Sequence, residues 1–350
     1  MNLQSVKPKN KIYFVIFGSL TNQTGTPLRI QNWIHAASQL EFSVKVLDLD
    51  HYSEEEIKAY LLSNLDKNDI VFTLNHIGIY KLKKIAKLRQ AQIISDIHGL
   101  NSIELNRSVA LSIKYKLLEL WINLYIFVFG ITTISVSKSI ERKCILNARK
   151  KNFIVYGGLK KINGVPNTKF KFSRNSKYIT YIGNNRSYQG VENLKLLFFQ
   201  ISSSLNFKFF LITVIENVAT VYENHDKPYA FIVDKKNIEW IMVNSDILVV
   251  PRLKNKITKY SFPSKIFDYI SSGTPILVSN NVEVLPEHLE KLLFRFDLIK
   301  TDSFKKNVNL ILNESFSARK MRNELLENLR SSYTWEAQLL NILNSILEDS

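Results

Sequence analysis

The chain has 350 residues, which is enough for two domains of ordinary size. A hydrophobic content of 45% and a charged content of 22% exclude an intrinsically disordered protein. The single cysteine, Cys144, excludes an internal disulfide and is typical of a reducing compartment. The polar, basic N-terminus is followed by an apolar run at 12–17 that is too short for a signal peptide, so we expect a cytoplasmic protein.

The formal net charge is +16, and the lysines and arginines are scattered rather than gathered in a long basic tract. This distribution favours attraction to anionic surfaces or anionic small molecules, although solubility alone could also account for it. The sequence shows no zinc-ligand spacing, aromatic-rich RNA motif or basic recognition helix. Nucleic acid is therefore not expected as a partner.

The first half of the chain alternates strand-like and helical stretches, which predicts an α/β fold with a parallel sheet covered on both faces. Ligands of such sheets bind at the carboxyl ends of the strands, so the residues directly after each run are candidates for a site. The predicted strands are 11–17, 43–49, 69–74, 92–96, 131–137 and 152–156.

Two of these strand ends carry candidate residues. Gly25 and Thr26 precede a helix expected at 28–40, and a glycine there lets a substrate approach the backbone closely, unless the loop is simply flexible. His98 follows the fourth strand and could meet a substrate hydroxyl, because histidine exchanges protons near neutral pH with little tuning. A structural role is the alternative for His98, and His76 after the third strand is a weaker candidate of the same kind.

The stretch 117–129 is apolar nearly all round and resembles a membrane span at first sight. Glu119 and Asn123 interrupt it and Gly130 ends it, so we expect a helix followed by a buried strand. The helix is rich in aromatic residues, and Lys114 and Lys116 precede it. This composition suits a helix that rests on an anionic membrane surface, and equally a core helix that is covered on both sides.

The polar stretch 164–177 contains proline and glycine and indicates a domain boundary. A second alternating series follows, so the chain is predicted to form two Rossmann-like domains that face each other across a cleft. The predicted strands of this half are 178–182, 207–214, 229–233, 246–250, 276–278 and 292–296, and its helices include 190–205, 236–243 and 336–347.

The stretch 259–279 predicts the end of a loop, a short helix and a strand. Pro263 is expected to open the helix, and Gly273 to end it in a left-handed conformation. Lys265 adds a cation to the free N–H groups of the first turn, and Asp268 lies one turn on, on the same face. These groups could hold the phosphates and ribose of a nucleotide, and a surface Lys–Asp pair is the alternative.

A glycine-bounded loop, 183–190, follows the first strand of the second half. Its glycines and Arg186 suit a diphosphate, and a plain turn is the alternative.

Several motifs, in this order along the chain, resemble the glycosyl transferases group 1 family of retaining, nucleotide-sugar-dependent enzymes with the GT-B fold. The stretch 262–278 resembles the family signature F-P-x-K-x-x-E-Y-x-x-x-G-x-P-(V/I)-(V/I), and 245–251 resembles its A-D-(I/V)-x-(V/L)-x-P strand. Further likenesses are the loop 183–190, the interdomain segment 163–170, the D-x-H-G segment 96–99 and the C-terminal helix that begins near Trp335.

The resemblance implies an acceptor-binding domain at 1–165, a donor-binding domain at 166–333 and a C-terminal helix at 334–350 that crosses back to the first domain. It implies a retaining hexosyltransferase that moves a sugar from a nucleotide diphosphate sugar to a glycan or lipid-linked acceptor. Envelope polysaccharide synthesis (capsule, O-antigen or exopolysaccharide) is the expected setting. The protein would be cytoplasmic, with a peripheral position on an anionic inner membrane face left open.

The resemblance also implies roles for individual residues. His98, Lys265 and Arg186 would be catalytic, and Gly25, Thr26 and His98 would bind the acceptor. The implied donor-binding residues are Gly183, Asn184, Arg252, Phe262, Pro263, Ser264, Lys265 and Asp268. No metal or other cofactor is expected, and the sequence contains no Asp-x-Asp pair at these motifs.

This chain departs from the family pattern at four positions. Asp268 is one methylene shorter than the usual glutamate, and Tyr260 stands at the position of its acidic companion. Asn184 and Gln189 occupy the places of the usual arginine and lysine in the glycine-bounded loop. One alternative is therefore a nucleotide-sugar-binding homologue without transfer activity, and another is a GT-B nucleotide-sugar epimerase.

Overall fold

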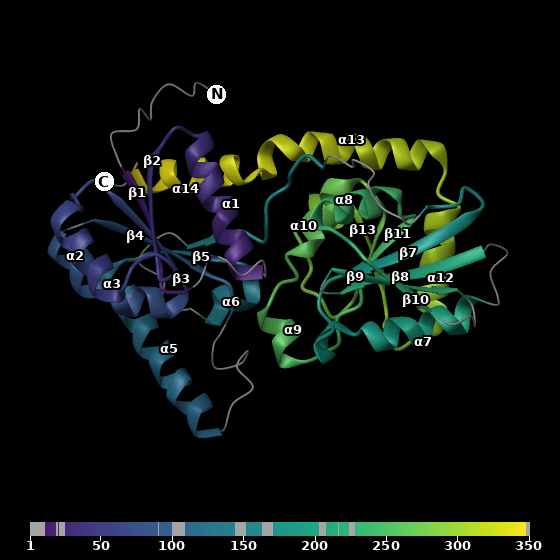
Figure 1. Ribbon diagram of the computed structural model, residues 1–350, viewed down its shortest axis with the longest axis horizontal. Helices are drawn as coiled ribbons and strands as arrows, with labels where there is room; N and C mark the ends of the chain where they lie inside the picture. Colours follow the sequence, from purple (N-terminus) through teal and green to yellow (C-terminus); the bar gives the residue numbers. More distant parts are fainter. Residues whose placement is uncertain are drawn as a thin grey trace. The chain divides into compact units, whose positions relative to one another are not determined.

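The computed structural model describes residues 11–18, 20, 25–89, 91–99, 109–143, 152–162, 171–202, 208–215, 217–223 and 228–347. The chain forms two compact α/β units (Figure 1). Unit 1 comprises Met1–Gly158, Tyr260–Phe262 and Tyr333–Ser350, and unit 2 comprises Leu159–Lys259 and Pro263–Ser332. The predicted interdomain segment 163–170 lies outside the described residues.

Unit 1 is built on a six-stranded parallel sheet with the strand order β2-β1-β3-β4-β5-β6. Its strands are β1 (Lys11–Ile16), β2 (Ser43–Asp48), β3 (Ile70–Leu74), β4 (Gln92–Ile97), β5 (Thr132–Ser135) and β6 (Asn152–Ile154). Its helices are α1 (Gly25–Gln39), α2 (Glu54–Asn64), α3 (Asn75–Arg89), α5 (Val109–Phe129), α6 (Lys138–Lys143) and α14 (Trp335–Leu347).

Successive side chains of a strand point to opposite faces of the sheet. Helices cover both faces here, so the strands are buried on both sides. Ile12 and Phe14 pack with α1 and α14 on one face. Tyr13 and Val15 pack with α2 and α3 on the other face. Alternate side chains of β1 thus belong to two separate hydrophobic clusters, one on each face of the sheet.

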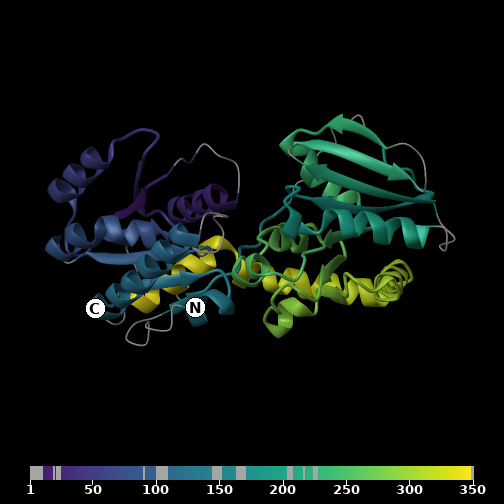
Figure 2. The same ribbon diagram turned by 90° about the horizontal axis from the view of Figure 1, so that it is seen from below.

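The C-terminal helix α14 belongs to unit 1, which confirms the predicted return of the chain to its first domain. Trp335 meets Trp33 of α1 edge to face, with ring centroids 4.7 Å apart. Gln338 Nε2 donates to the carbonyl oxygen of Gly157 at 2.9 Å. Leu339 is fully buried in the cluster that contains the buried side chains of α1. Figure 2 shows α14 in yellow within this unit.

Unit 2 is built on a seven-stranded sheet with the strand order β10-β9-β8-β7-β11-β12-β13. Its strands are β7 (Ser176–Ile182), β8 (Lys208–Ile215), β9 (Val218–Glu223), β10 (Tyr229–Ile232), β11 (Ile247–Val250), β12 (Ile276–Ser279) and β13 (Leu293–Phe296). Its helices are η2 (Ser187–Gln189), α7 (Val191–Ser202), α8 (Lys235–Asn244), α9 (Lys256–Tyr260), α10 (Lys265–Ser272), α11 (Glu287–Glu290), α12 (Thr301–Leu312) and α13 (Phe316–Tyr333).

The strand β9 is a finding beyond the sequence predictions. It pairs antiparallel with both β8 and β10, so one edge of an otherwise parallel sheet is antiparallel. Asn217, with a φ of 65°, lies between β8 and β9. An asparagine between two β-branched runs is a hairpin signal, and it marks the turn here.

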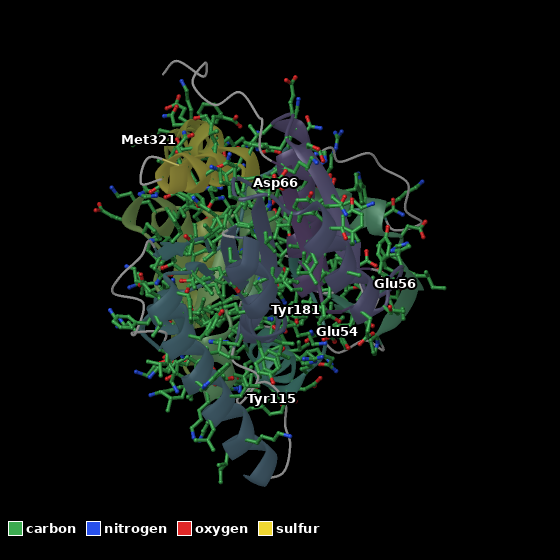
Figure 3. All side chains as sticks on the ribbon, turned by 90° about the vertical axis from the view of Figure 1, so that its left-hand side faces the viewer. Glu54, Glu56, Asp66, Tyr115, Tyr181 and Met321 are labelled. Atoms are coloured by element: carbon green, nitrogen blue, oxygen red, sulfur yellow. The ribbon has the colours of Figure 1, made fainter. Side chains whose placement is uncertain are left out.

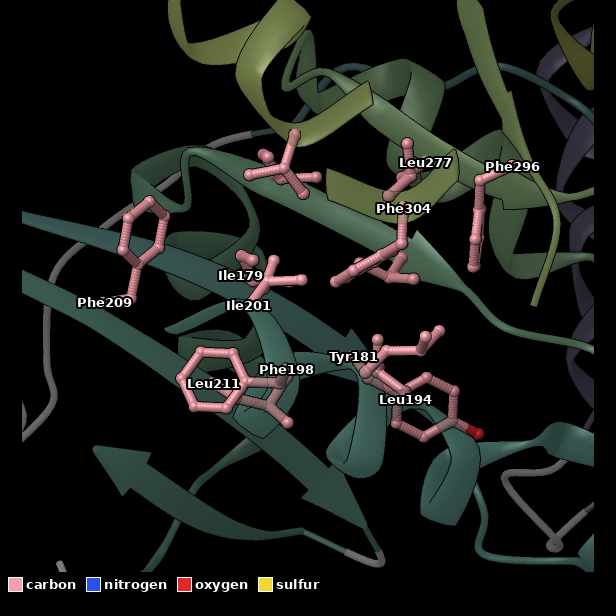
Figure 4. Packing of buried hydrophobic residues seen from close by; sticks show 14 of the residues in the cluster. Ile179, Tyr181, Leu194, Phe198, Ile201, Phe209, Leu211, Leu277, Phe296 and Phe304 are labelled. Carbon is pink, nitrogen blue, oxygen red and sulfur yellow. The ribbon is translucent and has the colours of Figure 1, made fainter. Parts of the chain in front are cut away.

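The core of unit 2 also has two faces. Ile179 and Tyr181 of β7 pack with α7 and α12, and Figure 4 shows Tyr181 among these side chains, with Phe198 and Phe304. Tyr178, on the alternate face of β7, packs with Phe210 and with Ile241 of α8. The parallel sheet of unit 1 and the largely parallel sheet of unit 2 confirm the predicted α/β fold class.

Candidate functional site

The strand order reverses once in each sheet, and such a point opens a crevice at the carboxyl ends of the strands. In unit 2 the reversal lies at β7, between β8 and β11. In unit 1 it lies at β1, between β2 and β3. In each unit a ligand is therefore expected at this reversal point, and the candidate residues should lie close to it.

In unit 2 the loop 183–190 connects β7 to α7 and is fixed against the end of β11. Gly190 has a φ of 73°, and a Cβ there would overlap the carbonyl oxygen of Pro251. The backbone N–H of Leu253 donates to the carbonyl oxygen of Tyr188 at 3.0 Å. Glycine is therefore required at 190 both for its conformation and for the close approach of β11.

Lys265 directs its ammonium group to this loop. Its Nζ donates to the Tyr181 hydroxyl at 3.1 Å and lies 3.4 Å from Gln189 Oε1. The Tyr181 hydroxyl in turn donates to the carbonyl oxygen of Asn184 at 2.6 Å. A Cβ on Gly183 would meet Lys265 Nζ, so the missing side chain at 183 leaves room for the cation.

The electrostatics of this group favour an anion. Burial lowers the pKa of Lys265 well below its usual range, and repulsion from Arg252 lowers it further. The Arg252 guanidinium lies 4.8 Å from the centroid of the Tyr188 ring. Among the described residues, no carboxylate lies within ion-pair distance of Lys265. A bound diphosphate would relieve the repulsion between the two cations.

The helix α10 begins at Lys265 rather than at Pro263 as predicted. The carbonyl oxygens of Pro263 and the exposed Ser264 accept the N–H groups of Ile266 and Phe267 at 3.0 and 3.1 Å, which forms a tighter turn before the helix. The left-handed end at Gly273 is confirmed, with a φ of 73°.

The helix is attached to β7 by Tyr269. Its buried hydroxyl accepts the backbone N–H of Ile182 at 2.9 Å. This bond fixes α10, with Lys265 one turn before Tyr269, beside the strand end that precedes the glycine-bounded loop.

Asp268 pairs with a residue that the sequence motifs did not indicate. Lys160 Nζ lies 3.2 Å from Asp268 and 3.1 Å from Glu239 of α8. Burial alone would lower the pKa of Lys160, but the two carboxylates outweigh it and the pKa is raised. The Asp268 side chain remains 37% exposed, so its carboxylate can still accept a hydrogen bond from a ligand.

The predicted catalytic residue Arg186 and the predicted donor-binding residues Asn184 and Phe262 form no hydrogen bond with Lys265 among the described residues. Arg186 and Asn184 are exposed on the loop, and the Arg186 backbone N–H lies 3.4 Å from Asn184 Oδ1. Phe262 belongs to unit 1, not to the domain in which the sequence placed it, and its ring packs 5.0 Å from that of Tyr156. Tyr260 also belongs to unit 1, with Lys143 Nζ 5.1 Å from its ring centroid.

In unit 1, His98 is held by two groups. Its Nε2 lies 3.0 Å from Asp96 Oδ2, within ion-pair distance. Its backbone N–H donates to Asn75 Oδ1 at 3.0 Å, and Asn75 adopts a φ of 54°. The buried Nδ1 of His98 has no hydrogen-bond partner among the described residues.

Asp96 is fully buried at the centre of a charged network. Arg29 donates to both carboxylate oxygens at 2.8 and 3.1 Å, and Trp33 Nε1 donates at 2.6 Å. Burial by itself would raise the pKa of Asp96, but Arg29 and His98 outweigh it and hold the pKa well below its usual range. The carboxylate is therefore ionised at neutral pH and orients the His98 imidazole.

A cavity of about 160 Å³ lies at the reversal point of unit 1. It is smaller than typical small-molecule pockets of roughly 300–1,000 Å³, so it fits part of a ligand. Asn75, which holds the His98 backbone, is one of its walls. The lining residues are Ile16, Phe17, Gly18, Leu20, Pro27, Ile30, Leu74, Asn75, Ile77 and Gly78.

Gly25 and Thr26 form the first residues of α1, just before Pro27 of the cavity wall, and their side chains lie outside the described residues. His76 is not part of the cavity. Its buried Nε2 lies 3.1 Å from Asn123 Oδ1 of α5, and burial lowers its pKa, so its role is structural. Across the described ranges, no group of three or more His, Cys, Asp or Glu side chains is arranged to hold a metal ion.

No protein-family model matches the sequence, and no curated protein matches it. The fold, in contrast, is shared with solved structures. Sucrose-phosphate synthase from Thermosynechococcus elongatus has a TM-score of 0.70 at 12% identity, over 97% of this chain and 100% of that one. The complex of Anabaena Alr3699/HepE with UDP has a TM-score of 0.62 at 10% identity, over 96% of this chain and 100% of that one.

A third similar structure is the UDP-forming α,α-trehalose-phosphate synthase from Burkholderia xenovorans in complex with glucose-6-phosphate. It has a TM-score of 0.64 at 9% identity, over 95% of this chain and 99% of that one. At these identities the likeness shows the fold, and the fold of this chain is the GT-B fold of glycosyltransferases.

Proposed function

We propose that the protein is a glycosyltransferase that moves a sugar from a nucleotide diphosphate sugar to a hydroxyl group with retention of configuration. The observation that carries the proposal is the pair of cations, Lys265 and Arg252, beside the glycine-bounded loop at the reversal point of unit 2. The Anabaena structure of the same fold was solved with UDP, which supports a uridine nucleotide as the first donor to test.

The hard step of such a reaction is departure of the leaving group. As the bond between the sugar C1 and the diphosphate breaks, negative charge grows on the diphosphate oxygens. Lys265 and Arg252 would stabilise that charge, and removing one such fixed donor typically costs about 3 kcal/mol. Asp268 would accept a hydrogen bond from the ribose. Arg186, exposed on the loop, would reach the diphosphate only after its side chain turns inward.

Unit 1 would hold the acceptor. The cavity lined by Asn75 lies at the end of the strand that neighbours β4, and His98 follows β4 itself. The ionised Asp96 fixes the imidazole, so His98 would orient the acceptor hydroxyl or accept its proton as the oxygen bonds to C1. We propose a glycan or lipid-linked acceptor in envelope polysaccharide synthesis, reached by a protein that lies on the membrane surface.

We also propose that the reaction needs no metal, because the two cations can take the charge-neutralising role. Turnover should then be unchanged by a chelator such as EDTA.

The assay that tests the function measures sugar transfer from UDP-sugars to lipid-linked and free glycan acceptors. Lys265→Met should lower turnover by about 100-fold, which corresponds to the loss of one transition-state donor. Lys306→Met, an exposed lysine of α12, is the matched control and should stay within twofold. If Lys265→Met and Asp268→Ala both stayed within twofold of the wild type, the site assignment would be wrong.

The same assay separates the alternatives. Donor conversion without any acceptor would indicate a nucleotide-sugar epimerase. Donor binding without turnover on any acceptor would indicate a binding homologue, for which Asn184 and Gln189 are the motivating departures from the family pattern.

A further inference from the structure

The helix α5 carries an apolar stripe on its exposed side. At 3.6 residues per turn, six large apolar positions of this helix fall within about 100° of one another around its axis and extend over about 22 Å. Leu117 and Leu120 are the most exposed, at 62% and 60%. The six residues of the stripe are Ile113, Leu117, Leu120, Trp121, Leu124 and Val128.

The opposite side of α5 is buried against unit 1. Ile122 and Ile126 pack on Ile79 of α3. Glu119 and Asn123, which interrupt the apolar stretch 117–129, are on this buried side. Among the described residues the helix is covered on one side, and of the two alternatives that the sequence left open, the core helix covered on both sides does not agree with this exposure.

The exposed charges of α5 lie at the borders of the stripe. Lys114 and Lys116 are exposed, and they fall on the two sides of the stripe when the helix is viewed along its axis. Over the described positions 113–129, every exposed side chain is apolar, aromatic or lysine, and none is acidic.

The stripe is accessible within its unit. In Figure 1 one end of α5 extends beyond the other elements of unit 1, and Figure 3 labels Tyr115 on this helix. The patch continues onto α3, where the exposed Tyr80 meets Trp121 with ring centroids 5.9 Å apart. A soluble surface rarely exposes so many adjoining large apolar side chains without an interaction partner.

We infer that the exposed face of α5 docks on an anionic lipid bilayer. The helix would lie in the interface plane, with the stripe in the acyl boundary and the lysines among the headgroups. Among the described residues, no helix is long and apolar enough to cross a membrane. Trp121, at one edge of the stripe, and the neighbouring Tyr80 suit the headgroup level, where aromatic rings with a polar edge gather.

Charge decides between a bilayer and a second copy of the chain. Each copy carries a net charge of +16, which opposes self-association and favours an anionic surface. The inference deepens the proposed membrane-surface location, but vesicle binding requires no sugar transfer, so the two proposals can fail separately.

The test is sedimentation of the full chain with vesicles of phosphatidylcholine containing about one-third phosphatidylglycerol, compared with phosphatidylcholine alone. The wild type should bind the anionic vesicles more tightly, and added salt should weaken that binding. Leu117→Gln with Leu124→Gln should weaken binding at least about tenfold. Leu196→Gln with Leu310→Gln is the matched control, because these leucines of unit 2 are 61% and 56% exposed, and it should bind as the wild type does.

The lysines give a second prediction with a different signature. Lys114→Gln and Lys116→Gln should each weaken binding to anionic vesicles about fivefold and leave binding to neutral vesicles unchanged. Trp121 fluorescence should shift to shorter wavelength on vesicle binding, and Trp121→Phe should remove that shift.

Three results would overturn the inference. One is a wild type that does not bind anionic vesicles. Another is equal weakening by the α5 pair and by the control pair. The third is a wild-type dimer that the α5 pair converts to a monomer, because the face would then belong to a second copy. Thermal unfolding of each variant shows whether it is folded before its binding is interpreted.

Discussion

At the scale of single residues, the buried carboxylate of Asp96 organises unit 1. It joins Arg29 of α1, Trp33 and His98. Arg29 also donates to the carbonyl oxygen of Val155 at 2.8 Å, and its guanidinium lies 5.1 Å from the ring centroid of Trp335. The histidine proposed to meet the acceptor is therefore positioned by the same residue that connects the sheet to α1.

Asp96→Asn should destabilise the protein by about 3 kcal/mol, because it leaves the buried Arg29 without its counter-charge. The pKa of Asp96 is lowered in the folded protein, so its contribution is complete at neutral pH and is lost as the pH falls below about 4. Urea unfolding at several pH values should show the wild type and the variant converging in acid. Glu324→Gln, which removes an exposed pair with Lys320, is the control and should leave the midpoint unchanged. A pH-independent difference would contradict this account.

At the scale of elements, glycines set where the donor loop and α10 end. Gly190 and Gly273 share a φ of 73°, but their surroundings differ. A Cβ at 190 would overlap the Pro251 carbonyl oxygen, whereas a Cβ at 273 would make ordinary contact with Leu326 at 3.8 Å. A substitution at 273 therefore tests the conformational strain alone, and a substitution at 190 tests the strain together with the steric overlap.

Gly273→Ala should cost about 1–2 kcal/mol, the price of the left-handed conformation for a residue with a Cβ. Gly190→Ala should cost more, because the loop must also move away from β11. Urea unfolding of both variants measures the difference, and UDP binding should fall only for Gly190→Ala. An equal loss of unfolding free energy in the two variants would contradict this account, because the overlap with the Pro251 carbonyl oxygen would then not affect stability.

The sequence predicts the strands of both sheets because β-branched runs alternate with helical stretches. The strand β9 escaped prediction because its hairpin signal is a single asparagine, Asn217.

Lys265 could be predicted from the start of its helix, and His98 from its place after a strand. Lys160 and Tyr181 could not, since their contacts with Asp268 and Lys265 join residues far apart in the chain. Phe262 belongs to unit 1 through a contact of the same kind, with Tyr156.

At the scale of the whole molecule, two α/β units share one chain that returns to its first unit at the end. The return is not a loose tail, because Leu343 of α14 is fully buried in the cluster that also contains Phe14 and Trp33. Unit 1 thus depends on its last helix to cover one face of its sheet.

Leu343→Ala should destabilise the protein by about 3 kcal/mol through loss of buried surface and the cavity left behind. Leu310→Ala, at an exposed position of α12, should change stability by less than about 0.5 kcal/mol. Calorimetric unfolding of the two variants provides the comparison. Equal effects would mean that α14 is not needed to cover the sheet.

The central claim is that Lys265 and Arg252 form the seat of a nucleotide diphosphate, and calorimetric titration with UDP tests it most directly. The wild type should bind UDP, Lys265→Met should weaken binding at least about tenfold, and Lys306→Met should leave it unchanged. Because the pKa of Lys265 is lowered, this lysine should lose its proton, and with it its positive charge, at a lower pH than an ordinary lysine does. Binding of UDP to the wild type should therefore weaken as the pH rises through that range, and Lys265→Met should not show this pH dependence. Equal UDP affinity in the wild type and Lys265→Met across this pH range would contradict the account.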